Sequence, residues 1–459
     1  MSSSSAMREA RDSGTALYLT AATVLVIASV SMPIAMGADQ DKGAPKKAVG
    51  NSASEIGIIL KRAKGAVDRG SHWLASRQNQ DGGYGPFGEE SYLRVKNASD
   101  VGLTAFALYA LARNPRKYSA VDGPFISDAV EFLINQQQKN GAIYDPRDPT
   151  LLNYKTSVTI LALSSLNRSK YSGTILRARS FTESLQFAEA RGYNRSKHLS
   201  YGGIGYGSGL RPDLSNTQFA LEAVRAAGLS QSDELWVRVQ PFLRLSLNSE
   251  KLDPRLAEHG IGTTKDGGAR YAPNATRGPV ETLDDGRRGF SSYGSMSYAA
   301  LKSFLYAHVA RDDPDVRGLF RWISRNYTVT ENPGMATKKK PRAGLHGLFY
   351  YYHTMAKALR AYGEPMIRDA QGAERHWSSE LASQLLSMQT IDGSWKNTSD
   401  RWYENLPTLD TSYAIVTLVE CMEQMRDEMS RAKSGQTSAT SRAKTKASTK
   451  TLKKSGAKG

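Results

Sequence analysis

A nine-residue pattern occurs three times along this chain and limits the possible folds more than any other feature of the sequence. It reads L-x-x-x-Q-x-x-D-G at residues 74–82 and 385–393, and residues 133–141 keep the same spacing with Asn140 in place of the acid. Each copy ends an apolar helical pattern at a glycine, the residue that most readily adopts the left-handed conformation of a helix end. Three such endings in similar segments indicate an internally repeated helical architecture.

Each copy is followed by a loop and then by a second helical segment rich in Ala and Leu. Six such segments are found, and three of them follow degenerate first halves. Their starts are Ser99, Asn153, Asp213, Tyr293, Leu345 and Leu409. Small residues aligned within them, from Ala107 to Ala414, lie 52, 61, 79, 57 and 58 residues apart. The second segments are apolar or small nearly all round, which is typical of helices buried on every side.

Six curving helix pairs can close into a ring, which hides both ends of the stack. We therefore predict an all-α fold, an (α/α)6 toroid of six helix-hairpin repeats over residues 55–428. The Q-x-x-D-G-x-aromatic repeat resembles that of squalene and oxidosqualene cyclases and of protein prenyltransferase β subunits. This resemblance implies that the Gln amide, as in Gln78 and Gln389, satisfies backbone groups where an outer helix ends.

The two ends of the chain lie outside the repeats. Residues 14–38 contain no charged residue and follow Arg8 and Arg11. This pattern predicts a signal peptide or an N-terminal membrane anchor over residues 1–37 and a linker over 38–54. We therefore expect an exported protein that is periplasmic, secreted or membrane-anchored. Cys421 is the only cysteine, so no internal disulfide is expected.

The formal net charge of +17 is concentrated at the C-terminus, where residues 431–459 contain nine Lys or Arg and no acid. Such a composition cannot bury enough apolar surface to fold alone, so residues 429–459 are predicted to be a basic, disordered tail. The tail suits contact with an anionic surface. No motif specific for nucleic acid accompanies it, and the sequence leaves the oligomeric state open.

In a toroid of this kind the N-termini of the inner helices surround one mouth of the central cavity, and the resemblance implies that catalytic groups lie there. Cyclases that act by protonation share a D-x-D-D-T motif whose middle Asp is the acid. The best match here is "TLDTS", in which Leu409 takes the position of the acid. Asp410 is then expected as a helix N-cap or as a displaced acid. Asp284 and Asp285, in a loop rich in Gly and Arg, are further candidates for a displaced acid.

Two other chemistries known on toroids are disfavoured. The prenyltransferase resemblance would place zinc ligands at Ser295 and Ser297, and serine is a poor zinc ligand, so no metal and no cofactor is predicted. Residues 421–424, "CMEQ", have the Cys-Gln spacing of toroids with an internal thioester. They lie late in the last inner helix, where a buried structural cysteine is the favoured interpretation.

A third set of candidates lies in "LHGLFYYYHTM". His346, Tyr350 and His353 are expected on one helix face, where they would either supply general acid and base groups or pack against neighbouring helices. The aromatic residues expected to line the cavity are Phe106, Tyr298, Tyr350 and Tyr413. Basic residues near the starts of the inner helices, such as Lys155 and Arg211, predict a positively charged mouth.

Three functions remain open on this evidence. The first is a squalene-cyclase-like toroid that lacks the known catalytic motifs and binds a ligand or partner in its cavity. The second is a divergent isoprenoid cyclase or transferase that uses one of the three candidate aspartates. The third is a glycan lyase or hydrolase that uses the His-Tyr-His set. The expected ligand is accordingly isoprenoid-like or an anionic glycan, and whether the chain is an enzyme stays open.

Overall fold

The computed structural model describes residues 53–85, 98–118, 120–207, 209 and 211–455, with side chains as far as Ala432. The predicted N-terminal signal or anchor and almost all of the linker lie outside these residues. Among the described helices, none combines the length and the apolarity needed to cross a bilayer.

Six inner helices pack in sequence to form a closed ring. They are α2 (Val101–Arg113), α4 (Leu152–Asn167), α6 (Leu214–Ala226), α9 (Gly294–Tyr306), α11 (Leu348–Tyr362) and α13 (Pro407–Ser455). Each packs against the next along the chain, and α13 packs against α2. The predicted all-α (α/α)6 toroid is therefore confirmed.

Six outer helices alternate with these along the chain, and each packs against one or two helices of the ring. They are α1 (Ala53–Ala75), α3 (Phe125–Asn135), α5 (Ser172–Ser184), α7 (Glu234–Leu245), α10 (Pro314–Arg325) and α12 (Trp377–Met388). The two classes differ in burial: every residue of α2 except Gly102 and Arg113 is buried, whereas α10 buries one stripe that includes Leu319 and Ile323. This difference follows from the all-round apolar pattern of the inner helices.

The loops between these helices contain short helical segments and strands. The helical segments are η1 (Ala120–Asp122), η2 (Glu189–Arg191), α8 (Pro254–Glu258), η3 (Pro341–Leu345) and η4 (Arg401–Tyr403). Two antiparallel hairpins also form, β1 (Val280–Thr282) with β2 (Arg288–Phe290) and β3 (Met366–Arg368) with β4 (Glu374–His376). The β1–β2 hairpin lies in the long glycine-rich connection between α7 and α9, which explains the largest spacing between repeats.

The recurrent glutamine ties neighbouring outer helices together. Gln78 Nε2 donates hydrogen bonds to the carbonyl oxygens of Gly82 (2.7 Å) and Phe125 (2.9 Å), the first residue of α3. Gln389 Nε2 likewise donates to Gly393 (2.8 Å) and to Ala66 of α1 (2.9 Å). The predicted structural role of the motif is therefore confirmed.

A second contact of the motif reaches inward to the next inner helix. The backbone N–H that follows the turn donates to a threonine hydroxyl in four repeats. The four pairs are Tyr84 with Thr104, Ile143 with Thr156, Ile204 with Thr217, and Trp395 with Thr411. Thr411, the threonine of "TLDTS", thus serves the fold in the same way as its three counterparts.

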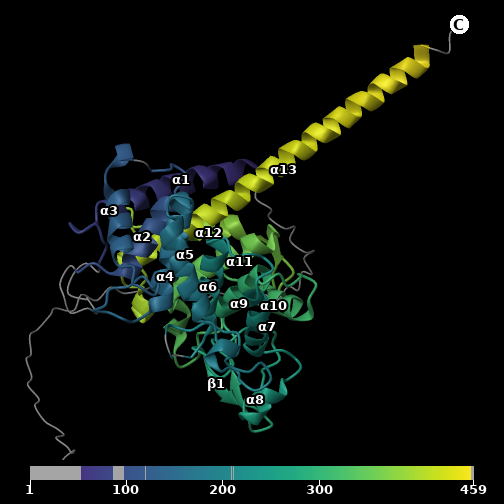
Figure 1. The fold of residues 1–459 in the computed structure, drawn as a ribbon. Coiled ribbons are helices and arrows are strands. Elements are labelled where there is room, and N and C mark those ends of the chain that lie inside the picture. Colours follow the sequence, from purple (N-terminus) through teal and green to yellow (C-terminus); the bar gives the residue numbers. More distant parts are fainter. Residues whose placement is uncertain (1–52, 86–97, 119, 208, 210, 456–459) are drawn as a thin grey trace, which may run out of the picture. The chain divides into compact units, whose positions relative to one another are not determined.

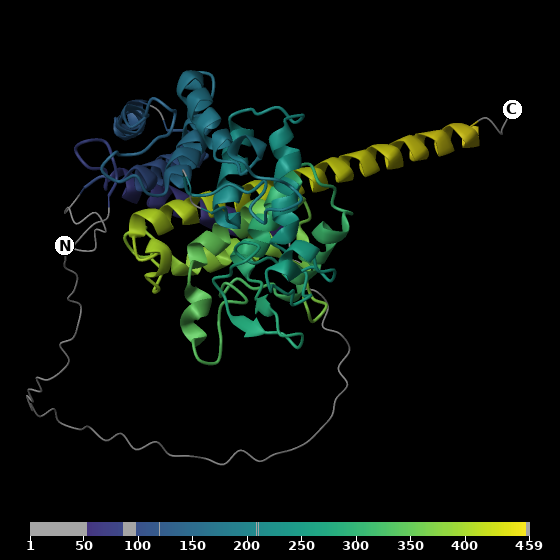
Figure 2. The ribbon, with the colours of Figure 1, turned by 60° about the horizontal axis from the view of Figure 1, so that its bottom comes forward.

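The last inner helix is much longer than the others. Its backbone is helical through Ser455, and α13 continues beyond the other helices in both views (Figures 1 and 2). The composition of residues 429–459 predicts disorder, so the structure differs from that expectation. No proline after Pro407 interrupts the helical pattern. The state of this segment in solution stays a prediction.

Candidate functional site

A cavity of about 210 Å3, here called the central cavity, lies where the inner helices begin. All six inner helices contribute residues from their first two turns, in line with the predicted cavity mouth at their N-termini. They are Gly102, Leu103 and Phe106 of α2, Tyr154 and Lys155 of α4, Ser215 of α6, Ser295 and Met296 of α9, Tyr350 of α11, and Leu409 and Tyr413 of α13. Three loops add further residues to the wall: the loop before α6 adds Tyr206, the loop before α9 adds Tyr271 and Arg277, and the loop before α13 adds Trp402, Tyr403 and Glu404.

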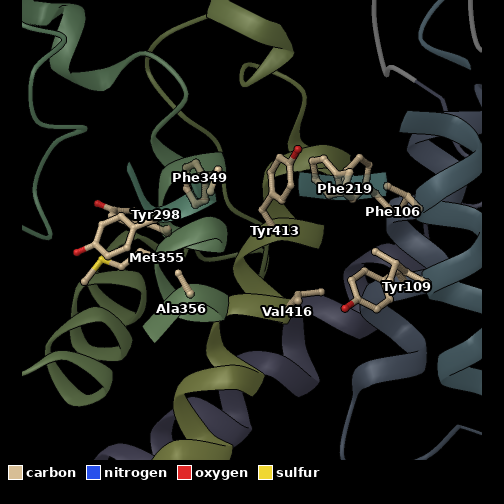
Figure 3. Packing of buried hydrophobic residues seen from close by; sticks show 14 of the residues in the cluster. Phe106, Tyr109, Phe219, Tyr298, Phe349, Met355, Ala356, Tyr413 and Val416 are labelled. Atoms are coloured by element: carbon tan, nitrogen blue, oxygen red, sulfur yellow. The ribbon is translucent and has the colours of Figure 1, made fainter. Parts of the chain in front are cut away.

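The lining is dominated by aromatic rings, namely Phe106, Tyr154, Tyr206, Tyr271, Tyr293, Tyr350, Trp402, Tyr403 and Tyr413. Phe106 packs edge-on against Tyr413 with 4.9 Å between ring centroids. Three of the four predicted aromatic residues are therefore confirmed as part of the wall. The prediction was wrong for Tyr298, which packs against Tyr351 at 5.7 Å and lies beside Met355, away from Phe106 and Tyr413 (Figure 3).

A chain of hydroxyl groups crosses three inner helices. Tyr154 Oη donates to Ser215 Oγ (2.7 Å), and Ser215 Oγ lies 2.8 Å from Tyr350 Oη. Gln218 Nε2 also donates to Tyr350 Oη at 3.3 Å. Burial raises the pKa of Tyr350 above its ordinary value, so this hydroxyl is a neutral hydrogen-bonding group at physiological pH.

Glu404 is a buried carboxyl in the wall of the central cavity, only 1% exposed. It accepts hydrogen bonds from the backbone N–H groups of Phe349 (3.0 Å) and Tyr350 (2.8 Å) in the first turn of α11, and from Asn397 Nδ2 (2.8 Å). Burial raises its pKa to about 7, although these donors act in the opposite direction. Sequence reasoning missed Glu404 because the carboxyl comes from a loop rather than from an inner helix.

Asp410 is fully buried and does not itself line the cavity. Because α13 begins at Pro407, the expectation that Asp410 is an N-cap was wrong. Its Oδ2 accepts from the backbone N–H of Asn397 (2.7 Å), and its Oδ1 has no hydrogen-bond partner among the described residues. Burial, followed by the nearby Glu404, raises the pKa of Asp410 far above its ordinary value. Asn397 thus connects two carboxyl groups that resist ionisation.

The predicted His-Tyr-His face does not exist as a helix face. His346 follows η3, and α11 begins only at Leu348, after Gly347 in a left-handed conformation (φ 63°). Tyr350 alone of the three lines the central cavity. His346 packs edge-on against Trp402 at 6.2 Å between ring centroids.

His353 lies beneath the cavity wall, stacked on Phe219 (5.9 Å) and 5.2 Å from Tyr413. It is buried, and neither ring nitrogen has a hydrogen-bond partner among the described residues. Burial, reinforced by Lys357, lowers its pKa well below the ordinary value. His353 is therefore a neutral ring in an aromatic stack.

Asp284 and Asp285 lie outside the central cavity, on the exposed turn between β1 and β2. Asp285 forms an ion pair with Arg287 at 2.5 Å. The structure therefore does not bring these two residues together with Asp410, which is consistent with the Gly- and Arg-rich context in which they occur.

Four buried charged residues and the half-buried Arg113 form an ion network further along the inner helices. Its members are Arg113, Glu222, Lys302, Lys357 and Glu420. Glu222 pairs with Lys302 and, at 2.6 Å, with Lys357, which lies 3.2 Å from Glu420. Sequence reasoning missed this network, although single charges within apolar runs such as "FALEAV" and "AALKSF" were its signal.

Three of the six described non-glycine residues with positive φ angles line the cavity. Leu151, Trp402 and Tyr403 have positive φ angles of 54°, 58° and 67° and all line the cavity. A bulky residue in this conformation costs on the order of 1–3 kcal/mol and is found mainly where the surrounding structure enforces it, often at functional sites.

The residues that the sequence raised for two other chemistries have structural roles. Ser297 Oγ accepts from the backbone N–H of Ala269 (3.1 Å), a structural contact like those of the four threonines. Within the described part of the chain, no group of three or more His, Cys, Asp or Glu side chains is placed to hold a metal ion. Cys421 is buried in α13, and burial raises the pKa of its thiol.

Comparisons with known proteins agree with this architecture. A profile of the A-macroglobulin TED domain matches residues 51–160. No curated protein sequence matches the chain significantly. An unsaturated glucuronyl hydrolase specific for heparin has a similar structure, with a TM-score of 0.51 and 11% identity over 81% of this chain and 98% of the hydrolase. The type II terpene cyclase MstE from Scytonema gives a TM-score of 0.47 and 15% identity over 80% of this chain and 99% of the cyclase.

These similarities concern the fold, because the sequence identities are low. At that level, the predicted toroid is confirmed by the closed ring of inner helices and by the structural similarity to the glucuronyl hydrolase. The chain is an α/α toroid with an aromatic central cavity at the N-terminal ends of its inner helices.

Proposed function

We propose that this toroid binds an apolar, isoprenoid-like ligand in its central cavity. The observation that carries the proposal is the wall of aromatic rings at the starts of the inner helices. Aromatic faces bury large apolar areas and pack well against hydrocarbon. Concave, mostly apolar sites with a few convergent polar groups are the usual form of ligand sites.

Binding is proposed in preference to cyclisation started by an acid. Leu409, not a carboxyl, faces the cavity at the position that the resemblance assigns to the acid. The carboxyl of Asp410 is buried behind that position and held by Asn397. Export through the N-terminal segment belongs to the same proposal, and N-terminal sequencing of the mature protein tests it.

The test is mass spectrometry of lipid extracted from the full-length protein after expression in an isoprenoid-producing host. We expect a bound isoprenoid close to a one-to-one ratio. Gly102→Leu fills the cavity, because a Cβ at Gly102 meets only Asp100 Oδ1 (3.1 Å) and Lys155 Cγ (3.7 Å), and it should remove the ligand. Gly173→Leu, on the exposed side of outer helix α5, is the matched control and should keep it. A wild-type protein without lipid would overturn the proposal.

An acidic sugar is the second candidate ligand. The hydroxyl chain of Tyr154, Ser215 and Tyr350 favours it, because sugars are recognised through hydroxyl contacts. The structurally similar hydrolase is named as specific for heparin. Isothermal titration of the full-length protein with a heparin disaccharide distinguishes the candidates, since an isoprenoid site should give no heat with this probe.

A further inference from the structure

Two cationic side chains line the central cavity, Lys155 and Arg277, and only Lys155 has a carboxylate partner in a salt bridge. Lys155 is buried and neutralised, because its Nζ pairs with the Asp148 carboxylate and also donates to the Asp148 carbonyl oxygen (3.0 Å). Arg277 forms no salt bridge with any carboxylate of the described residues. An unneutralised guanidinium in a mostly aromatic site is the feature that remains unexplained by the fold.

Arg277 stands in a fixed position beside two tyrosine hydroxyls. Its guanidinium carbon lies 4.3 Å from the centroid of the Tyr271 ring, and the hydroxyls of Tyr271 and Tyr206 hydrogen-bond to each other. The backbone on both sides of Arg277 is anchored, since Thr276 Oγ1 donates to the Ser291 carbonyl (2.9 Å) and the Ser291 N–H donates to the Pro279 carbonyl (3.1 Å).

The carboxyl groups near this corner of the cavity are already engaged elsewhere. Asp213 is buried and accepts from Asn216 through both its backbone N–H (2.9 Å) and its Nδ2 (2.8 Å). Glu404, the buried carboxyl of the cavity wall, accepts from the first turn of α11 and from Asn397. Asp213 attracts Arg277 electrostatically, but neither carboxyl forms a salt bridge with it, so the guanidinium can still pair directly with an anionic ligand.

We propose that Arg277, together with the hydroxyls of Tyr206 and Tyr271, binds a carboxylate or phosphate group of the cavity ligand. The ligand is then an amphiphile whose apolar body lies against the aromatic rings and whose single anionic group lies at Arg277. This inference rests on the proposed function. The planar guanidinium suits both anions, because it offers paired donors that match their oxygen atoms.

The experiment compares three probes that share one hydrocarbon tail, namely farnesol, farnesoic acid and farnesyl monophosphate. Their dissociation constants are measured on the full-length protein by displacement of a fluorescent apolar probe, at 0.05 M and 0.5 M salt. We expect at least one anionic probe to bind about tenfold or more tightly than the alcohol, in line with the strength of charge-assisted hydrogen bonds. This advantage should shrink at high salt, while alcohol binding stays unchanged.

Arg277→Gln should remove the advantage of the anion, so that farnesoic acid and farnesyl monophosphate bind no more tightly than farnesol to the same variant. Arg277→Lys should restore part of the advantage, because it keeps the charge and loses the paired donors. Arg288→Gln is the matched control: Arg288 is exposed, lies over Phe290 at 5.6 Å and does not line the cavity. Thermal unfolding of each variant checks that the fold is kept.

The outcomes separate the two proposals. The inference is supported if Arg277→Gln loses the preference for the anionic probes and Arg288→Gln keeps it. The anion that the wild type prefers then distinguishes a carboxylate ligand from a phosphate ligand. Equal binding of alcohol and anions to the wild type, or a preference that survives Arg277→Gln, overturns the role of Arg277 and leaves the apolar site standing. No binding of any probe overturns the proposed function and this inference with it.

Discussion

Glu404 occupies a position that its local sequence does not reveal. The loop "RWYENLP" is polar enough to be taken for solvent-exposed, yet it folds back to place this carboxyl against the backbone N–H groups that begin α11. The spacing of residues along a chain predicts which side chains share a helix face, but not which loop carboxyl meets a helix from another repeat. The burial of Glu404 therefore could not be predicted from the sequence.

The raised pKa of Glu404 has a consequence for stability. The carboxyl titrates at about 4.5 when unfolded and at about 7 when folded, so folding favours its protonated form. Its contribution is fully present below pH 4.5 and is lost as the pH rises through 7, by roughly 3 kcal/mol at about 1.4 kcal/mol per pH unit. Glu404→Gln should flatten this part of the pH dependence in urea unfolding between pH 4.5 and 8.

Infrared spectroscopy supplies an independent readout for the same residue. A protonated carboxyl band that titrates near pH 7 should be present in the wild type and absent from Glu404→Gln. Glu258→Gln, at an exposed position in α8, is the control and should change neither measurement. An unchanged band in Glu404→Gln would contradict the assignment.

The lowered pKa of His353 leads to a pH dependence of stability with the opposite sign. Its lowered pKa means that the unfolded chain binds a proton more readily, so its contribution to stability is present above pH 6.5 and is lost as the pH falls below that value. His353→Phe keeps the stack on Phe219 and removes two unpaired ring nitrogens. It should raise the free energy of unfolding by about 1–3 kcal/mol, with a larger gain at pH 5 than at pH 8.

The same substitution at a histidine with partners should have the reverse effect. His376 Nε2 lies 2.8 Å from Glu428 Oε2, and its Nδ1 accepts from the Ser379 N–H at the start of α12. His376→Phe is therefore expected to lower the midpoint of thermal unfolding. If both variants shift the midpoint in the same direction, the unpaired state of His353 does not explain its effect.

At the scale of elements, the motif that predicted the fold also shows the limit of the prediction. Gln186 Nε2 donates to the carbonyl oxygens of Gly202 (3.1 Å) and Leu235 (3.2 Å), as the other motif glutamines do in their repeats. Here, an insertion containing η2 separates the glutamine from its glycine, so the contiguous pattern is absent. The glutamine contacts between helices are kept despite this insertion, whereas the spacing of the motif residues along the sequence is lost.

Replacing a motif glutamine measures how much one of these junctions contributes. Gln389→Leu leaves the carbonyl oxygens of Gly393 and Ala66 without their donor and should lower the free energy of unfolding by about 1–3 kcal/mol. Gln371→Leu, at an exposed position in the β3–β4 turn, is the control and should change it by less than about 0.5 kcal/mol. Urea unfolding gives both values, and equal effects would argue against the junction.

A helix break was likewise foreseeable from one residue. Gly347 separates His346 from α11, and its left-handed conformation is the one in which glycine carries no steric cost. The apolar pattern on both sides of it outweighed this single signal in the sequence-based prediction. The inner helices as such could be predicted, because their pattern extends over many residues, whereas their first residues could not.

At the scale of the whole molecule, the ion network links five of the six inner helices, since Arg113 of α2 pairs with Glu420 at 3.1 Å. Glu222 of α6 neutralises Lys302 of α9 and Lys357 of α11, and Glu420 of α13 also pairs with Lys357. Removing one charge from a buried set leaves its partners uncompensated, which costs more than the set contributes when complete. Removing a single charge from the network should therefore lower the free energy of unfolding more than removing an oppositely charged pair.

Glu222→Gln should lower the free energy of unfolding by about 3–5 kcal/mol, since two buried lysines lose their shared counter-ion. The double variant Glu222→Met with Lys302→Met should recover a large part of this loss. Asp68→Ala, in the exposed pair of Lys64 and Asp68 (3.0 Å), is the control and should cost less than about 1 kcal/mol. A double-mutant cycle in urea would contradict this account if Glu222→Gln cost no more than the control.

The closure of the ring also bears on how the chain is made. The first helix, α1, packs mainly against the last, α13, and α2 completes the circle with the same helix. On the ribosome, the apolar faces of α1 and α2 therefore stay uncovered until almost the whole toroid has been synthesised. Until α13 is made, the nascent chain is an open arc of helix pairs with exposed apolar surface at its ends. A chaperone or a neighbouring nascent chain can therefore compete with α13 for the faces of α1 and α2.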